Sequence, residues 1–239
     1  MDSNLTRWAV ITGISKGIGK AIALRLAQEG FSLIGCARGQ KELDLLVSEI
    51  HLCYPDVQIR VTVADLADPQ QVNAFAQFAT GITAHVHLLV NNAGLFMPGS
   101  VLGDTAGHLE TMMQINLYSA YHITRALAPA MVTQRSGHIF NLCSVASLQA
   151  YPGGATYAIT KFAMLGFSRS LREELRSSGV RVTTLLPGAT WSDSWAGVDL
   201  PQDRLMPASD IADILWSAYS LSPNAVVEEI LLRPQLGDL

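Results

Sequence analysis

Cysteine is scarce in this sequence, with only Cys36, Cys53 and Cys143 among 239 residues. An odd count at long spacings matches neither a disulfide framework nor the paired spacing of a zinc site, and it favours a reducing compartment. Charged residues are also few, at 15 %, and the net charge is −4. Because no basic stripe is present to follow a phosphate backbone, we expect no nucleic-acid partner.

Long hydrophobic runs are missing as well. No apolar stretch approaches the roughly 20 residues that a membrane-spanning helix needs. The segment Met1–Trp8 is polar and lacks the apolar core of a signal peptide. His85 and His87 stand two positions apart, but no carboxylate or cysteine cluster accompanies them, so we predict no metal site. Together these absences favour a cytoplasmic protein without a membrane partner.

What the sequence does contain is an alternation of short, β-branched apolar runs with longer helical patterns. Strands are predicted at Trp8–Thr12, Ser32–Cys36, Gln58–Val63, Leu88–Asn91, His138–Cys143, Val180–Leu185 and Val226–Leu232. Helices are predicted at Gly17–Glu29, Lys41–Leu52, Pro69–Thr80, Gly107–Met131, Thr156–Ser177 and Ser209–Leu221. This alternation predicts one α/β domain over residues 1–239, a doubly wound and mainly parallel seven-stranded sheet with helices on both faces. Ligands of such sheets bind beyond the carboxyl ends of the strands.

A glycine-rich loop follows the first predicted strand, with the sequence Thr12-Gly13-Ile14-Ser15-Lys16-Gly17-Ile18-Gly19. Glycines let backbone N–H groups approach a pyrophosphate closely, and the N-terminus of the next helix favours an anion. A glycine-rich β–α turn without a ligand is the alternative. The spacing resembles the TGxxxGxG motif of the short-chain dehydrogenase/reductase family, which implies a Rossmann-type fold and cofactor contacts from Gly13, Ser15, Lys16, Gly17, Ile18 and Gly19.

The end of the second strand bears on the choice between NAD and NADP. Dehydrogenases that use NAD usually carry an acid there for the ribose 2′-OH, but Ala37 takes that place here and Arg38 follows. A guanidinium binds a 2′-phosphate bidentately, and Lys16 is a second candidate for the same phosphate. Arg38 as a solvated loop residue is the alternative. We therefore predict NADP(H) as the cofactor.

Further residues match the family in order and spacing. The resemblance assigns the following residues to the cofactor: Asp65 and Leu66 at the adenine, Asn92, Ala93 and Gly94 of an NNAG element, and Pro187, Gly188 and Ser192 at the nicotinamide. Ser192 stands where relatives often have Thr, and it keeps the hydroxyl. The resemblance also implies a catalytic group made of Asn116, Ser144, Tyr157 and Lys161.

The chemistry of carbonyl reduction explains these residue types. The reaction needs a hydride at carbon and a proton at oxygen, and a free phenol, with a pKa of about 10, is a poor base near neutrality. Tyr157 and Lys161 are four residues apart on one helix face, so we expect the ammonium to lower the pKa of the phenol. The resemblance implies that Ser144 donates to the substrate oxygen, that Lys161 also holds the nicotinamide ribose, and that Asn116 joins Lys161 to a proton relay through water.

The substrate side is predicted from the family's variable lid, which should span about residues 189–207. Trp191 and Trp195 in this lid suggest an aromatic wall for a flat or apolar substrate. Coverage of the core or of a subunit interface is the alternative for both tryptophans. Phe96 and Tyr151 are expected to line the rest of the pocket, together with Ser144.

A narrower resemblance lies in the C-terminal half. The segments 195–198 and 226–234 look like bacterial sepiapterin-reductase-type members. The resemblance predicts an NADP(H)-dependent carbonyl reductase or alcohol dehydrogenase for sepiapterin-like or dicarbonyl substrates, with 3-oxoacyl thioester reduction as the runner-up. A non-catalytic NADPH-binding regulator is the alternative of another class. The apolar fraction of 49 % and the helix pairing typical of the family predict a homodimer or homotetramer.

Overall fold

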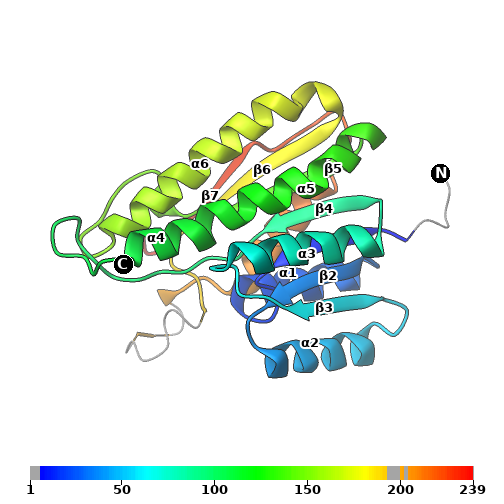
Figure 1. Ribbon diagram of the computed structural model, residues 1–239, viewed down its shortest axis with the longest axis horizontal. Coiled ribbons are helices and arrows are strands. Elements are labelled where there is room, and N and C mark those ends of the chain that lie inside the picture. Colours follow the sequence, from blue (N-terminus) through cyan, green and yellow to red (C-terminus); the bar gives the residue numbers. More distant parts are fainter. Residues whose placement is uncertain (1–5, 193–199, 202–203, 239) are drawn as a thin grey trace.

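The computed structural model describes residues 6–192, 200–201 and 204–238, which contain one seven-stranded sheet (Figure 1). Its order is β3-β2-β1-β4-β5-β6-β7, and every neighbouring pair is parallel. The strands are β1 (Trp8–Thr12), β2 (Ser32–Ala37), β3 (Ile59–Val63), β4 (Val86–Asn91), β5 (Gly137–Leu142), β6 (Val180–Pro187) and β7 (Glu229–Leu232). The chain order reverses between β1 and β4, and such a switch point opens a crevice at the carboxyl ends of the strands.

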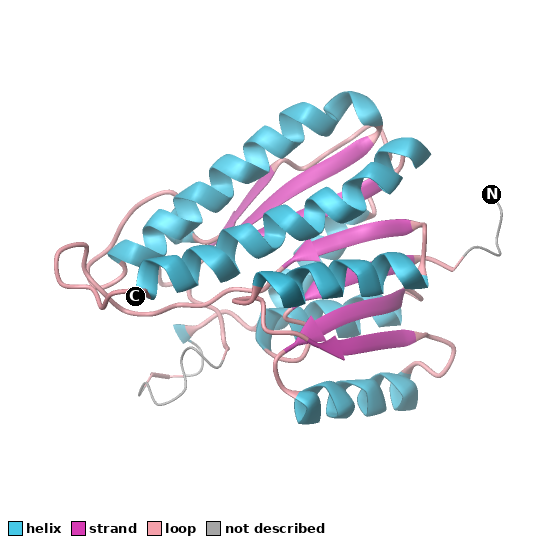
Figure 2. Cartoon of the chain, in the orientation of Figure 1, coloured by secondary structure: helices cyan, strands magenta, loops and turns pink. Residues whose placement is uncertain are grey.

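Helices cover both faces of the sheet, as Figure 2 shows. One face carries α1, α2 and α7, and the other carries α3, α5 and α6. Their bounds are α1 (Gly17–Gln28), α2 (Gln40–Cys53), α3 (Pro69–Ile82), α4 (His108–Met113), α5 (Ser119–Gln134), α6 (Ala155–Leu175) and α7 (Ala208–Tyr219). No helix in the described part of the chain is long and apolar enough to cross a membrane.

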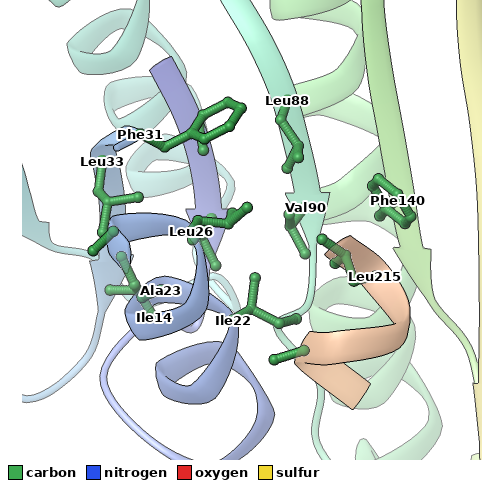
Figure 3. Packing of buried hydrophobic residues seen from close by; sticks show 14 of the residues in the cluster. Ile14, Ile22, Ala23, Leu26, Phe31, Leu33, Leu88, Val90, Phe140 and Leu215 are labelled. Atoms are coloured by element: carbon green, nitrogen blue, oxygen red, sulfur yellow. The ribbon is translucent and has the colours of Figure 1, made fainter. Parts of the chain in front are cut away.

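The strands are unbroken apolar runs because the side chains of each strand pack into two hydrophobic cores, one on each face of the sheet. Successive side chains of a strand point to opposite faces, so Ile11 of β1 packs under α1 and α7 whereas Val10 packs under α3 and α5. Figure 3 shows the first of these cores, in which Ile22 and Leu26 of α1 lie near Val90 and Leu215. Burial on both faces thus accounts for the absence of the polar–apolar alternation of a half-exposed sheet.

Most predicted elements begin and end within two residues of the observed ones, but two differ more. The helix predicted over Gly107–Met131 is divided into α4, a π-helical turn at Gln114–Tyr118 and α5, which runs on past Pro129. The last strand begins at Glu229 rather than Val226, and before it the Val227 carbonyl oxygen accepts from the Thr183 hydroxyl instead of a backbone N–H. The sheet is also wholly, rather than mainly, parallel.

Candidate active site

A cavity of about 1040 Å³ lies at the carboxyl ends of β1, β2, β4, β5 and β6. It is continuous from the turn after β2 to the first turn of α6. All the residues predicted to bind a cofactor line it: Gly13, Ser15, Lys16, Gly17, Ile18, Gly19, Arg38, Asp65, Leu66, Asn92, Ala93, Gly94, Tyr157, Lys161, Pro187, Gly188 and Ser192. Segments that are far apart in the sequence therefore meet at one edge of the sheet.

The glycine-rich loop forms a cradle in the middle of this cavity. Gly13 and Gly17 have φ angles of 66° and 51°, in the left-handed region that favours glycine. A β-carbon at Gly19 would overlap the carbonyl oxygen of Gly13, so only glycine lets α1 approach the loop this closely. Lys16, the N-cap of α1, gives no side-chain bond to the first turn of the helix. The bare backbone and the helix N-terminus fit a pyrophosphate group.

Hydrogen bonds between the loop and the end of β4 hold the cradle in place. The Thr12 hydroxyl oxygen accepts from the backbone N–H groups of Asn92 and Ala93, both at 3.0 Å. The Asn92 amide in turn donates to the carbonyl oxygens of Thr12 at 2.8 Å and Gly13 at 3.2 Å. The NNAG element thus fixes the glycine loop to the centre of the sheet.

The far end of the cavity carries charged side chains beyond β2. Ala37 ends the strand, and the exposed Arg38 follows it on the cavity wall. Lys16 approaches from the glycine loop, and its Nζ lies 3.5 Å from Glu42 of α2. Sequence reasoning did not single out Glu42, because nothing in its position within α2 signals that its side chain turns back toward the loop.

The opposite end of the cavity holds Ser144, Tyr157 and Lys161. Ser144 follows β5 and caps the 3₁₀ turn Val145–Ser147, its Oγ accepting from Ala146 N at 3.1 Å. Tyr157 lies in the first turn of α6 and is hydrogen-bonded to Ser144. Lys161 is one helical turn further on, with its Nζ 5.7 Å from the centroid of the Tyr157 ring. The three groups therefore share one wall of the cavity.

The electrostatics of this group differ from the expectation. Burial raises the pKa of Tyr157 to about 12, against a smaller lowering by the Ser144 hydrogen bond. Lys161 Nζ donates to the Leu142 carbonyl oxygen at 2.8 Å, and burial lowers the pKa of the lysine as well. Burial thus keeps the phenol pKa above its ordinary value in the protein alone, and the lowering of that pKa by the neighbouring ammonium stays a prediction.

Asn116 lies behind this wall rather than in it. It is buried in the π-helical turn, and π-turns often mark functional sites. Its Oδ1 accepts from Leu95 N at 2.7 Å, and its Nδ2 donates to Thr160 Oγ1 at 2.9 Å. A β-carbon on Gly94 would lie 3.6 Å from both Asn116 Oδ1 and Lys161 Nζ, so both side chains reach the same glycine.

The predicted substrate residues divide into three groups. Phe96 and Tyr151 line the cavity, and the Phe96 ring packs edge-on against Tyr157 with centroids 5.2 Å apart. Trp195 lies outside the described residues, as does much of the predicted lid. Trp191 is described but does not line the cavity: its extended segment pairs with Met206, so Thr190 and Ser192 face the cavity and Trp191 does not.

Two further lining residues were missed by the sequence analysis. Asp238 reaches the cavity from the C-terminal tail, where Arg204 donates to the backbone carbonyls of Gly237 at 2.8 Å and Asp238 at 2.9 Å. Gln149 follows the 3₁₀ turn that Ser144 caps. Neither carries a motif, and only the path of the folded chain brings them to the site.

A parallel sheet with a glycine-rich loop after its first strand, and with a serine, tyrosine and lysine at its carboxyl edge, defines a dinucleotide-binding type of oxidoreductase. Comparison with known proteins specifies the family. The family model described as short chain dehydrogenase matches residues 7–202. The chain belongs to the short-chain dehydrogenase family.

Individual relatives cover nearly the whole chain. A sepiapterin reductase of Chlorobaculum tepidum is 34 % identical and covers 96 % of this chain and 97 % of its own. Among solved structures, a metagenomic short-chain oxidoreductase in complex with NADP is 30 % identical, with a TM-score of 0.84 and coverage of 98 % and 99 %. An alcohol dehydrogenase of Thermococcus sibiricus, complexed with 5-hydroxy-NADP, is 26 % identical with a TM-score of 0.88 and coverage of 97 % of both chains.

Proposed function

We propose that this oxidoreductase is an NADP(H)-dependent carbonyl reductase and alcohol dehydrogenase. The observation that carries the proposal is the layout of the cavity, with Arg38 and Lys16 at one end and Ser144, Tyr157 and Lys161 at the other. The glycine cradle between them accounts for a pyrophosphate. The 30 % identical metagenomic relative bound to NADP supports the choice of cofactor.

The residues at the cation end would hold the cofactor's distinguishing phosphate. Arg38 is exposed on the wall, and a guanidinium matches two phosphate oxygens at once. No acid stands at the end of β2 to repel the phosphate, since Ala37 occupies that place. Asp65 and Leu66 lie on the same wall beyond β3 and fit the adenine side. At the other end, Lys161 has ammonium protons left over after its bond to Leu142, and these suit ribose hydroxyls.

The proton chemistry belongs to Tyr157 and Ser144. When bound, NADPH supplies the hydride to the carbonyl carbon. Tyr157 gives its phenolic proton to the carbonyl oxygen, and the Lys161 ammonium offsets the burial that raises the pKa of this phenol to about 12. Ser144 donates a hydrogen bond to the same oxygen and holds it in place. The phenolate left behind lies close to the Lys161 ammonium, which stabilises it until a proton returns through the Asn116 side of the wall.

The substrate class we propose is a small carbonyl compound, sepiapterin-like or a dicarbonyl. The relative from Chlorobaculum tepidum supports this class. Phe96 and Tyr151 supply aromatic faces beside Tyr157, which suit a flat substrate. The segment 189–207 remains our prediction for the substrate lid, with Ser192 at its cavity side. Reduction of a 3-oxoacyl thioester is an outcome that the assay below distinguishes.

We further infer that the chain works as a homodimer or homotetramer. Tyr118, Tyr121, Ile159 and Phe162 are exposed on α6, on α5 and on the π-helical turn before it. The two helices lie together on one face of the sheet (Figure 1). The Tyr121 ring of α5 packs against Phe167 of α6. Exposed apolar side chains grouped in this way suit a partner surface.

The test of the proposal is NADPH consumption in the presence of carbonyl compounds. We expect the nicotinamide absorbance to fall with diacetyl or sepiapterin, and Tyr157→Phe to lower kcat by at least about a hundredfold because it removes the proton donor. NADPH binding should persist in the variant, because the phosphate contacts are at the other end. Tyr54→Phe, remote from the cavity, is the matched control and should leave the rate unchanged.

Three other outcomes would redirect the assignment. Turnover that survives Tyr157→Phe would remove the phenol from the mechanism. Tight NADPH binding without turnover over a broad carbonyl panel would favour a regulator. Consumption only with 3-oxoacyl thioesters would keep the chemistry and change the substrate class.

A further inference from the structure

Glu42 holds a carboxylate against the cation end of the cavity. It lies in the first turn of α2 and folds back so far that a β-carbon on Gly39 would overlap its Oε2 atom. Its Oε1 lies 3.5 Å from Lys16 Nζ, across the gap between α2 and the glycine loop. Both side chains line the cavity, as do Arg38 and Gly39. The pair therefore lines the same cavity as Arg38, the other candidate phosphate-binding cation.

The two candidate cations, Arg38 and Lys16, differ in their charge partners. In the described part of the chain, Arg38 has no ion-pair or hydrogen-bond partner. Lys16 is paired with Glu42, and this pair is partly exposed, with 52 % and 35 % of the two side chains accessible. A dianionic phosphate that reaches Lys16 would also meet the Glu42 carboxylate within a few ångströms, and like charges at that distance repel.

We propose that Glu42 is a built-in competitor for the 2′-phosphate and lowers the preference of this site for NADPH over NADH. The proposal rests on the proposed NADP(H) function. The Glu42 carboxylate offsets part of the Lys16 charge and repels a phosphate that approaches that ammonium. A ribose with a free 2′-hydroxyl makes no such demand, since it carries no charge and can donate to a carboxylate. Glu42 thus sets the ratio of the two affinities without acting in the chemical step.

The proposal can be tested on nucleotide fragments, with no need for turnover. Adenosine 2′,5′-bisphosphate carries the distinguishing phosphate, and adenosine 5′-diphosphate lacks it. We expect Glu42→Gln to tighten the bisphosphate by about fivefold, as measured by calorimetric titration, and to leave the diphosphate within about twofold. The difference should shrink in about 0.5 M salt, because this site is partly exposed and screened.

Glu49→Gln is the matched control for net charge. Glu49 lies on the same helix and pairs with Lys20 at 2.7 Å, but it does not line the cavity. Equal tightening of the bisphosphate by both variants would show a general field effect and would overturn the local role of Glu42. Unchanged bisphosphate binding in Glu42→Gln, with the protein folded by its melting curve, would overturn it directly.

Arg38→Ala separates this proposal from the proposed function. We expect it to weaken the bisphosphate by at least about tenfold and the diphosphate far less, because a bidentate guanidinium contact to phosphate is lost. If Arg38→Ala weakens both fragments equally, the NADP(H) assignment itself fails. If Arg38→Ala is selective and Glu42→Gln has no effect, only the competing role of Glu42 fails.

Discussion

Lys161 is a charged side chain that the fold buries almost completely, with 4 % of its surface accessible. Burying an ammonium is costly unless its protons are bonded. The Leu142 carbonyl accepts one of them, and an ammonium has three to give. Lys161 lines the cavity together with Tyr157 and Gly94, which leaves the other two protons for a ligand there. Hydroxyl groups of a bound ribose would accept the remaining two protons and offset the cost of burying the ammonium. Binding this ribose is the role that we propose for Lys161.

His138 is a second buried titratable group, far from the proposed chemistry. It lies in β5 with none of its surface accessible, and its Nε2 is 2.7 Å from Thr183 Oγ1. The ring stacks on Phe140 and Tyr219, and its Nδ1 has no partner among the described residues. Burial, together with the nearby Arg181 charge, lowers the pKa of His138 to about 2. The fold therefore keeps this imidazole neutral at every ordinary pH.

The low pKa of His138 predicts that the folded protein loses stability in acid. Below the ordinary histidine pKa of about 6.5, the unfolded chain takes up a proton that folded His138 does not, so stability falls as the pH falls. Between about pH 6 and about pH 4 this residue should remove about 2.5 kcal/mol from the free energy of unfolding. Urea unfolding at each pH should show that His138→Phe removes this part of the slope.

The control is His51→Phe, on the exposed side of α2, which should keep the wild-type pH slope. A constant offset between His138→Phe and the wild type would reflect packing alone. Parallel stability curves over this pH range would therefore contradict the buried-imidazole explanation.

Asp104 anchors the segment between β4 and α4, residues 92–107, to the first turn of α6. Its Oδ2 accepts from the Thr156 hydroxyl, and its Oδ1 lies 2.9 Å from His108 Nδ1. The backbone adds two bonds beside it: Gly99 N donates to Gly153 O at 2.9 Å, and Ala155 N donates to Gly99 O at 3.3 Å. Asp104 thus joins the segment to the turn of α6 that carries Tyr157.

We predict that Asp104→Ala raises KM for the carbonyl substrate by about tenfold and changes kcat by no more than about threefold. The reason is that the segment positions Phe96 against Tyr157, and a loosened segment would no longer fix the pocket wall. The affinity for NADPH should stay the same, because its phosphate site is at the far end of the cavity. Steady-state kinetics and a nucleotide titration measure these effects.

Asp104→Asn gives the graded comparison. The amide keeps one oxygen acceptor, so Asp104→Asn should raise KM less than Asp104→Ala does. A fall in kcat with unchanged KM in both variants would place Asp104 in the chemical step and contradict a role in holding the segment.

At the scale of the whole molecule, the elements that the sequence predicted best are those with one dominant signal. Unbroken apolar runs marked the strands, and a glycine loop between a strand and a helix marked the nucleotide cradle. The resemblance to the family supplied the proposed catalytic set, since four residues from three separate segments show no common pattern of their own.

What the sequence did not predict depends on side-chain paths and burial. The π-helical turn around Asn116 lies inside a continuous helical pattern, so nothing in the periodicity reveals the extra residue. The raised pKa of Tyr157 follows from burial, which a motif does not measure. Glu42 and Asp238 reach the cavity only because one side chain turns back and the C-terminal tail folds over the sheet.

The exposed apolar side chains of α5 and α6 bear on the assembly of the protein. Phe162 of α6 is 47 % exposed within the apolar group shared with α5, and a charge there would be buried without a partner in any interface that covers it. Light scattering after size exclusion should therefore show the wild type as a dimer or tetramer and Phe162→Glu as a smaller species. Leu52→Glu is the matched control, because Leu52 is 84 % exposed on α2, away from this group, and the same change there should keep the wild-type mass. A monomeric wild type would rule out the homo-oligomer, and an unchanged mass in Phe162→Glu would move the interface to another face.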